Sequence, residues 1–381
     1  MARTGGQSRR AARQKGTRSS AQHSSGKQSR ARAASWRLWG KLAVAVLAIA
    51  VTALAITLGN SSGGAGTAGQ IPDRRVVPDE APKPNSALDL SAFEAMTAED
   101  LIALSDDELD AMDPLIMNMI VARGLPELTE LEFERYVETV DHWASIIARG
   151  LAAQQADGLH LDEATWQADP NIWRAGGMAI AVGGRAIGIS YTRSVEGDDH
   201  ADLFVPGMID ERAGTCSNLP VLYMAIGHRL GWPIRAVVTA DHMWTRWDEG
   251  EPGPEDGGSY FNLEATATEV DGGEGSFATP PDSSYIEDFE VSWQSIEMGS
   301  DMTTLTARQT LGVYLQQRAS YWAFHEDTQK VRADLELALQ CFPENVDIRM
   351  TMGQLLWNLN QMVQSGAEPN GPPAPTEPAD D

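Results

Sequence analysis

The longest apolar stretch of the chain lies near its N-terminus. It runs from Leu42 to Leu58 and is broken only by Thr52 and Thr57. A helix over this stretch would be roughly 25 Å long, which is near the lower limit for crossing a bilayer. The pattern therefore predicts a transmembrane helix over residues 41–59. A cleaved signal peptide and a buried core helix are the competing interpretations.

The segments on either side of this stretch differ in composition. Residues 1–40 are rich in Arg, Ser, Gln, Gly and Ala and are predicted to be a disordered basic tail, because they carry few large apolar side chains. Residues 60–87 are rich first in Gly and Ser and then in Pro, which predicts a flexible linker. The positive charge precedes the apolar stretch, so we expect a single-pass membrane protein with a cytoplasmic N-terminus and an extracytoplasmic main domain.

Helical patterns dominate residues 88–195, which we interpret as an N-terminal helical region. Thr97 and Ser105 each precede acidic residues and then an apolar residue, as N-cap residues do. Asp113 followed by proline predicts the start of another helix. From 133 to 151 the apolar residues recur with helical spacing, which predicts a longer amphipathic helix.

The pattern changes in residues 196–300. An apolar stretch from Ser217 to Leu230, followed by Gly231, predicts a buried helix with a defined end. Three stretches with the spacing and residue types of strands follow, over 234–239, 242–247 and 260–266. A helix followed by consecutive strands indicates an α+β core.

Helical spacing returns in residues 301–363. One amphipathic helix is expected over 305–321, and two more over 331–359, separated by a turn that contains Pro343. The last two resemble one tetratricopeptide-like unit, which is too little for an independent solenoid, so we expect them to cap the core. Residues 364–381 are rich in Pro and acids and are predicted to be a disordered tail.

Charge is distributed unevenly along the chain, whose formal net charge is −25. Of its 29 basic residues, 11 lie in residues 1–72, which contain no acid; the remainder has 18 basic and 54 acidic residues, a balance of −36. Such a body would repel polyanions, so we expect it to bind no nucleic acid. Two cysteines are too few for a disulfide scaffold or a cysteine-rich zinc protein. We expect no metal and no cofactor, and interpret the acids around His200 as a solvated loop.

Candidate chemistry lies in the α+β core. Cys216 immediately precedes the predicted helix, where the positive end of the helix dipole favours a thiolate. His242 begins the second predicted strand, and Glu264 and Asn262 lie on the third. A nucleophile, a base and an orienting group on adjacent elements are the components of thiol acyl transfer. Strand residues two apart share a face, so Glu264 and Asn262 remain equal candidates for the third position.

Several sequence blocks around these residues are similar to those of a bacterial transglutaminase-like family. The similarity extends over roughly residues 100–360, and its Cys and His blocks are specific. The blocks include Arg212-Ala213-Gly214-Thr215-Cys216, Asp241-His242-Met243 and Phe261-Asn262-Leu263-Glu264-Ala265-Thr266.

The resemblance implies a papain/transglutaminase-like core with a Cys–His–acid triad. Cys216 would be the nucleophile, His242 the base and Glu264 the third member, in a position where transglutaminases usually carry Asp. The implied activity is cysteine-dependent acyl transfer on amides, either hydrolysis or transamidation, in a membrane-anchored protein. The opposing hypothesis is a non-catalytic interaction module. Three tryptophans are expected to wall the cleft: Trp232, Trp244 and Trp247.

Overall fold

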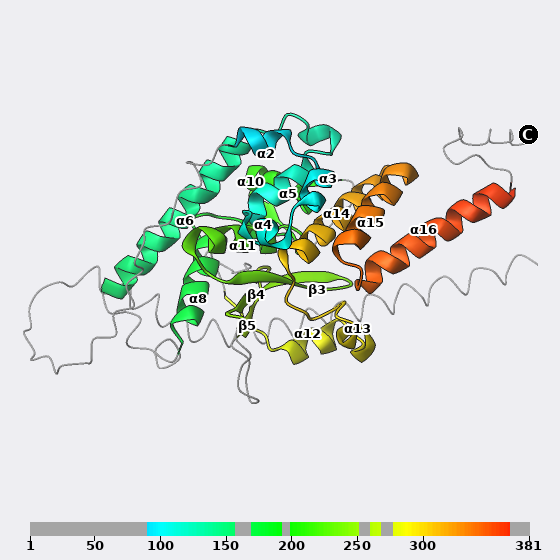
Figure 1. The fold of residues 1–381 in the computed structure, drawn as a ribbon. Coiled ribbons are helices and arrows are strands. Elements are labelled where there is room, and N and C mark those ends of the chain that lie inside the picture. The colour runs from blue at the N-terminus through cyan, green and yellow to red at the C-terminus, as the bar shows by residue number, and fades with distance from the viewer. Residues whose placement is uncertain (1–89, 157–168, 193–198, 251–259, 268–276, 366–381) are drawn as a thin grey trace, which may run out of the picture. The chain divides into compact units, whose positions relative to one another are not determined.

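In the computed structural model, the described residues are 90–156, 169–192, 199–250, 260–267 and 277–365 (Figure 1). The chain divides into two units, Met1–Ile71 and Pro72–Asp381, and every described residue belongs to the second unit. The predicted basic tail, the apolar stretch of residues 41–59 and the linker all lie outside the described residues. Among the described residues, no helix combines the length and the apolar character needed to cross a membrane.

The N-terminal part of the described chain is helical, as expected. Thr97 and Ser105 each form a capping box, in which the hydroxyl accepts a backbone N–H and an acidic side chain three residues later accepts the cap's own N–H. Helix α5 is buried along nearly its whole length, which is typical of an internal helix. The elements are α2 (Ser91–Ala95), α3 (Ala98–Ala103), α4 (Asp106–Ala111), α5 (Pro114–Ala122), the 3-10 helix η2 (Pro126–Leu128) and α6 (Phe133–Ala156).

The next segment adds a helix that the apolar pattern did not predict. Helix α8 spans Pro170–Gly183, and the Asp169 carboxylate at its N-cap accepts the N–H groups of Asn171 and Ile172. An Asp-Pro pair is the same start signal that identified α5, so the sequence did carry a mark of α8. Four short elements follow: β1 (Ser190–Tyr191), α9 (His200–Leu203), α10 (Val205–Glu211) and β2 (Ala213–Gly214), with β1 and β2 parallel.

A buried helix and a three-stranded antiparallel sheet form the centre of the fold, which is α+β. Helix α11 (Leu219–Leu230) precedes β3 (Ile234–Thr239), β4 (His242–Asp248) and β5 (Tyr260–Leu263), and the sheet order is β3-β4-β5. The helix starts two residues later than predicted. Strand β5 ends three residues earlier, so the prediction that placed Glu264 on this strand was wrong.

Glycine brings α11 close to the sheet. A Cβ at Gly227 would stand 3.0 Å from side-chain atoms of Ile234 at the start of β3, so a larger residue would push the helix away from the strand. Gly231 ends the helix with φ +67°, as its position in the sequence predicted. This short connection sets the direction in which β3 leaves α11.

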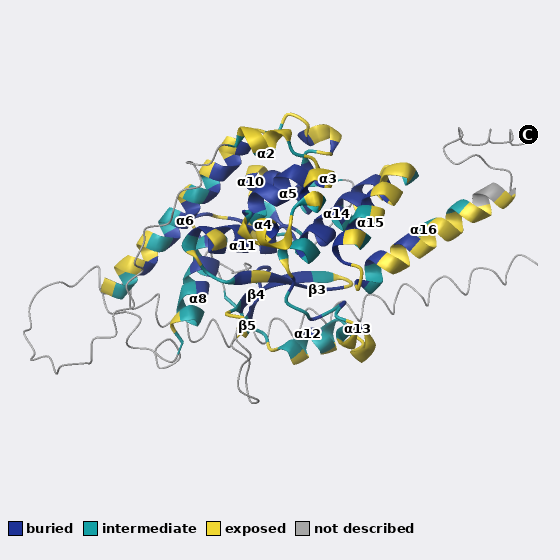
Figure 2. Cartoon of the chain, in the orientation of Figure 1, coloured by how far each residue is buried: buried dark blue, intermediate teal, exposed yellow. Residues whose placement is uncertain are grey.

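The sheet has helices on both faces (Figure 1). On one face α11 joins α5, α6 and α14 (Ala307–Phe324) around the main apolar core (Figure 2). On the other face α12 (Asp282–Asp288) and α13 (Trp293–Glu297), neither of which was predicted, contribute to a smaller core. That smaller core consists of Val237, Trp244, Tyr285 and Met302, with partly buried neighbours.

The chain then passes along β3 before it becomes helical again. Met302 donates its N–H to the Val238 carbonyl, Leu305 donates to the Ala236 carbonyl, and Thr304 pairs with Val237. Helices α15 (Thr328–Cys341) and α16 (Val346–Ser365) follow α14 and confirm the three predicted C-terminal helices. Most of α16 is exposed (Figure 2).

Candidate active site

Cys216 lies in a tight turn just before α11. The turn is fixed by its neighbours: the Thr215 N–H donates to Asn218 Oδ1 at 2.8 Å, and the Ser217 N–H donates to Thr215 Oγ1 at 3.0 Å. Asn218 also donates from Nδ2 to the carbonyl of Ala201 in α9, at 2.7 Å. Thr215 and Asn218 are buried, whereas Cys216 itself is half-buried. The turn therefore holds the sulfur at a fixed place while leaving it partly accessible.

His242 is the first residue of β4 and lies opposite Thr239 across a tight hairpin. Its side chain is only 7% exposed. The Cys216 side chain is among the groups that raise the pKa of this ring, which places it beside the imidazole, and the ring Nε2 lies 3.0 Å from Glu264 Oε2. Because the carboxylate engages Nε2, Nδ1 is the ring nitrogen left for the thiol. Three side chains that lie 22 to 48 residues apart in the sequence thus form one continuous polar chain.

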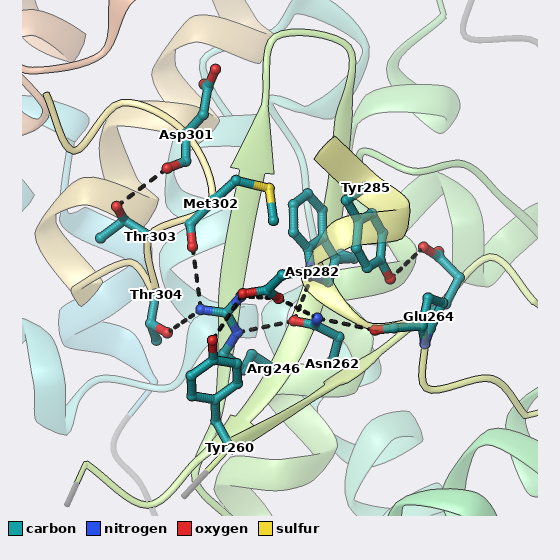
Figure 3. Close-up of polar contacts among 12 residues, drawn as sticks. Arg246, Tyr260, Asn262, Glu264, Asp282, Tyr285, Asp301, Met302, Thr303 and Thr304 are labelled. Carbon is teal, nitrogen blue, oxygen red and sulfur yellow. Dashed lines mark hydrogen bonds and ion pairs between the residues drawn. The ribbon is translucent and has the colours of Figure 1, made fainter. Parts of the chain in front are cut away.

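Glu264 follows β5 directly, and its N–H donates to the Ala278 carbonyl instead of to the sheet. The carboxylate is buried, and four donors surround it. Thr266 donates both its N–H (2.9 Å) and its hydroxyl (2.6 Å) to Oε1. Tyr285 donates its hydroxyl to Oε2 at 3.1 Å, on the same oxygen that faces His242 (Figure 3). The carboxylate charge is therefore fully hydrogen-bonded, which is the condition for keeping it buried.

Asn262, the other candidate for the third position, is committed elsewhere. Its Oδ1 accepts hydrogen bonds from Trp244 Nε1 (3.1 Å) and from Arg246 Nε (2.9 Å). Its Nδ2 donates to the Pro280 carbonyl and to Asp282 Oδ1, so it links β4 to the start of α12 (Figure 3). Of the two candidates, the structure brings Glu264 to the His242 ring.

The charges of the pair follow from its surroundings. Burial on its own would lower the pKa of His242, but the Glu264 carboxylate and the hydrogen bonds to Cys216 and Glu264 raise this pKa to about 10, from 6.5. Burial would raise the pKa of Glu264, yet the His242 charge and the hydrogen bonds from His242 and Thr266 hold it below its usual value. At neutral pH the pair is an imidazolium and a carboxylate. An imidazolium beside a cysteine sulfur is the arrangement found in reactive cysteine sites.

Aromatic rings hold the His242 ring in its plane. Phe289 stacks on it with centroids 4.9 Å apart and planes 9° apart, and Trp244 and Tyr285 lie nearly parallel to it at 5.9 and 6.3 Å. Trp244 is fully buried and Trp247 is 2% exposed, so the expectation that these tryptophans wall an open cleft was wrong. Trp232 is half-buried and packs on Trp247. These rings position the site from within the fold.

Sequence reasoning missed the part of the site that α12 provides. Tyr285 contacts Glu264, and Asp282 pairs with Arg246 at 2.9 Å. Arg246 also donates to the carbonyl of Met302 and the hydroxyl of Thr304, both at 3.2 Å (Figure 3). A helix of seven residues that follows two prolines leaves almost no periodic signal.

Comparison with known proteins returned no match to a family model, a curated protein or a solved structure. The chemical capacity of the site is therefore judged from its own side chains. A sulfur, an imidazolium and a buried carboxylate placed side by side can perform nucleophilic attack on an acyl group and the proton transfer that goes with it.

Proposed function

We propose that the chain is a transglutaminase-like, cysteine-dependent acyl transferase that acts on amides of a protein or peptide. The observation that carries this proposal is the polar chain in which the His242 ring lies beside Cys216 and 3.0 Å from Glu264. The papain-like character of the core is part of the same proposal, supported by a nucleophile at the start of a buried helix and a base on the facing sheet.

The reaction begins with attack of the Cys216 sulfur on the carbonyl carbon of a peptide or Gln side-chain amide. The tetrahedral intermediate collapses as the C–N bond breaks, and the His242 imidazolium gives its proton to the departing amine. The product is a thioester on Cys216. Water, or an amine such as a lysine, then attacks the thioester; neutral His242 takes its proton, and the sulfur departs.

The oxyanion of the intermediate needs hydrogen-bond donors. The Cys216 N–H makes no hydrogen bond to any described residue, which supports it as one such donor. Its place at a tight turn just before a helix also aligns it with the positive end of the α11 dipole.

Labelling with iodoacetamide tests the nucleophile directly, because the chain has two cysteines. Cys341 is buried, and burial raises its pKa to about 11, so it is the matched control. The Cys341→Ala variant should label at Cys216 as the full chain does, whereas Cys216→Ala should lose the label and any amide turnover. Equal turnover in the Cys216→Ala variant would refute the proposal.

Amine incorporation distinguishes the two acyl acceptors. Incubation of the full chain with casein and a fluorescent primary amine should label casein if transamidation occurs, and should only release ammonia or new termini if water is the acceptor. The acidic body, with a balance of −36, favours substrates that bear lysine or other basic groups.

Anchoring in a membrane belongs to the same proposal and is supported by the sequence of residues 41–59. Leu47→Arg should release the chain from the membrane fraction, because a charge near the centre of a spanning helix is unfavourable by about 2.5–3.5 kcal/mol, while Leu47→Ile should not.

A non-catalytic interaction module is the second candidate. It is favoured by the exposed apolar side chains of α16, where Met350, Leu356 and Trp357 are 69%, 46% and 59% exposed. The labelling experiment separates the two: an interaction module would show no turnover that depends on Cys216.

A further inference from the structure

We propose that Tyr285 is a positioning residue, whose hydroxyl fixes the Glu264 carboxylate in the orientation that meets His242. The expected effect on turnover rests on the proposed function, whereas the expected effect on the His242 titration does not. Tyr285 comes from α12, and its hydroxyl lies 3.1 Å from Glu264 Oε2 (Figure 3). The same oxygen lies 3.0 Å from His242 Nε2.

Glu264 needs two restraints because its side chain has one more rotatable bond than an aspartate. Thr266 holds Oε1 with two donors, but rotation about the axis through that oxygen would still carry Oε2 away from the ring. Tyr285 supplies the donor on the second oxygen. With both oxygens fixed, the carboxylate has one orientation, and Nε2 of His242 has a defined partner.

The tyrosine itself has little freedom. It is 1% exposed, and its ring stacks on Trp244 with centroids 4.0 Å apart and planes 6° apart. The first residue of α12, Asp282, contacts Arg246, Asn262 and the hydroxyl of Tyr260. A hydroxyl carried on a ring and a helix that are both held in place can define the position of another group.

The groups that face this arrangement come from α11, α12 and β4 and from the segments next to α11 and β5. Cys216 and Glu264 face His242. Glu264 is in turn faced by Tyr285 and, at longer range, by the buried Tyr223 of α11, while Arg246 and Asp282 lie near Tyr285. While His242 is protonated, the imidazolium itself stabilises the carboxylate. The neutral Tyr285 hydroxyl therefore contributes most to the carboxylate once His242 has lost its proton. Its removal should therefore make His242 hold its proton more strongly.

The test is a titration of His242 by NMR in the full chain and in Tyr285→Phe, with the signal assigned from a His242→Gln variant. The phenylalanine keeps the stack on Trp244, so we expect a folded variant. The pKa of His242 should move up, and kcat should fall about tenfold with KM unchanged, because the carboxylate is no longer held in one orientation. A titration that superimposes on that of the unmodified chain would overturn the inference.

Tyr321→Phe is the matched control. Tyr321, in α14, also donates its hydroxyl to a carboxylate, that of Glu127 in η2, at 2.7 Å to each oxygen. This pair lies on other elements than the His242 site. Its removal should leave the His242 titration unchanged. A shift as large as that of Tyr285→Phe would show a global effect and would also overturn the inference.

A second measurement keeps the test valid if Tyr285→Phe fails to fold. Site-specific replacement of Tyr285 by 3-fluorotyrosine keeps the shape of the ring and makes the hydroxyl a stronger donor. The pKa of His242 should then move down, opposite to the phenylalanine variant; no movement would count against the inference. These titrations do not depend on turnover, so a chain whose turnover is unaffected by Cys216→Ala would refute the proposed function while leaving Tyr285 still testable.

Discussion

The two ends of α11 hold two clusters of charged groups that are built in opposite ways. At the C-terminal end Arg229 lies among Asp113 and Asp141, its Nη1 2.9 Å from Asp113, with the side chains of Arg229 and Asp113 1% exposed. At the N-terminal end Cys216 is half-buried, next to the His242–Glu264 pair. The first cluster joins three helices, α5, α6 and α11, whereas the second joins a helix to a sheet.

The two clusters differ in whether they can exchange a proton with their surroundings. Arg229 carries a guanidinium, the side-chain cation that pairs best with carboxylates, in the last turn of a helix, so its cluster is a permanent link. The His242 pair can gain and lose a proton, and its sulfur is partly accessible. The permanent link holds α11 in place, and the titratable one lies at the opposite end of this helix, where the proposed reaction takes place.

Glu264→Gln should give the largest effect, and this effect falls on the chemistry of the proposed reaction. The Thr266 N–H holds the amide oxygen at the Oε1 position, so the amide NH2 must face His242 Nε2. The ring is then forced to carry its proton on Nδ1, where it cannot take the thiol proton. We expect kcat/KM to fall about 10³- to 10⁴-fold when it is measured at a temperature where the variant is folded. A tenfold loss or less would mean that Glu264 does not orient His242.

Arg229→Met should act on stability. It leaves the buried Asp113 and the half-buried Asp141 without their cation, which is unfavourable by about 3–5 kcal/mol. Urea unfolding measures this loss. Arg332→Met is the matched control, because Arg332 forms an exposed pair with Glu336 and should lose less than about 0.5 kcal/mol. Similar losses in the two variants would contradict the role assigned to the buried cluster.

Asn262→Ala should show that the neighbouring candidate has a structural role. It removes the acceptor for Trp244 and Arg246, and unpaired buried donors are unfavourable by about 1–3 kcal/mol. The free energy of unfolding should fall by that amount while the pKa of His242 stays unchanged. A shifted His242 titration would place Asn262 in the same unit as Glu264.

The pH dependence of the free energy of unfolding should show the smallest effect per pH unit. The pKa of His242 is raised to about 10 in the folded chain from 6.5, so its protonation contributes stability that is complete below pH 6.5 and is lost as pH rises toward 10. The slope in that range is at most about 1.4 kcal/mol per pH unit. Glu264→Gln should flatten it; an unchanged slope in this variant would assign the effect to other groups.

The sequence predicted the elements that have a strong periodic signal. The buried helix before β3, the hairpin that carries His242 and the three C-terminal helices all lie where the pattern placed them, within a few residues. The transmembrane helix over residues 41–59 stays a prediction. The papain-like interpretation and the catalytic roles also remain proposals.

The finer features of the site could not be obtained in this way. Glu264 and Asn262 share a face on an ideal strand, but the chain leaves the sheet after Leu263, and only this departure brings Glu264 to the ring. Tyr285 lies on a seven-residue helix without an apolar period. Trp244 was expected at a cleft because aromatic residues often line one, but its contacts with Asn262 and Tyr285 place it inside the fold.

The passage of residues 302–305 along β3 has one further consequence. Without it, β3 would be the outer strand of the sheet and would present free N–H and C=O groups of an apolar segment to solvent. Such an edge is a template on which a second chain can add a strand, which is how sheet proteins aggregate. The hydrogen bonds from Met302 and Leu305 use the Val238 and Ala236 carbonyls of this edge within the same molecule. A change that displaced this segment would therefore expose the chain to self-association before it unfolded the core.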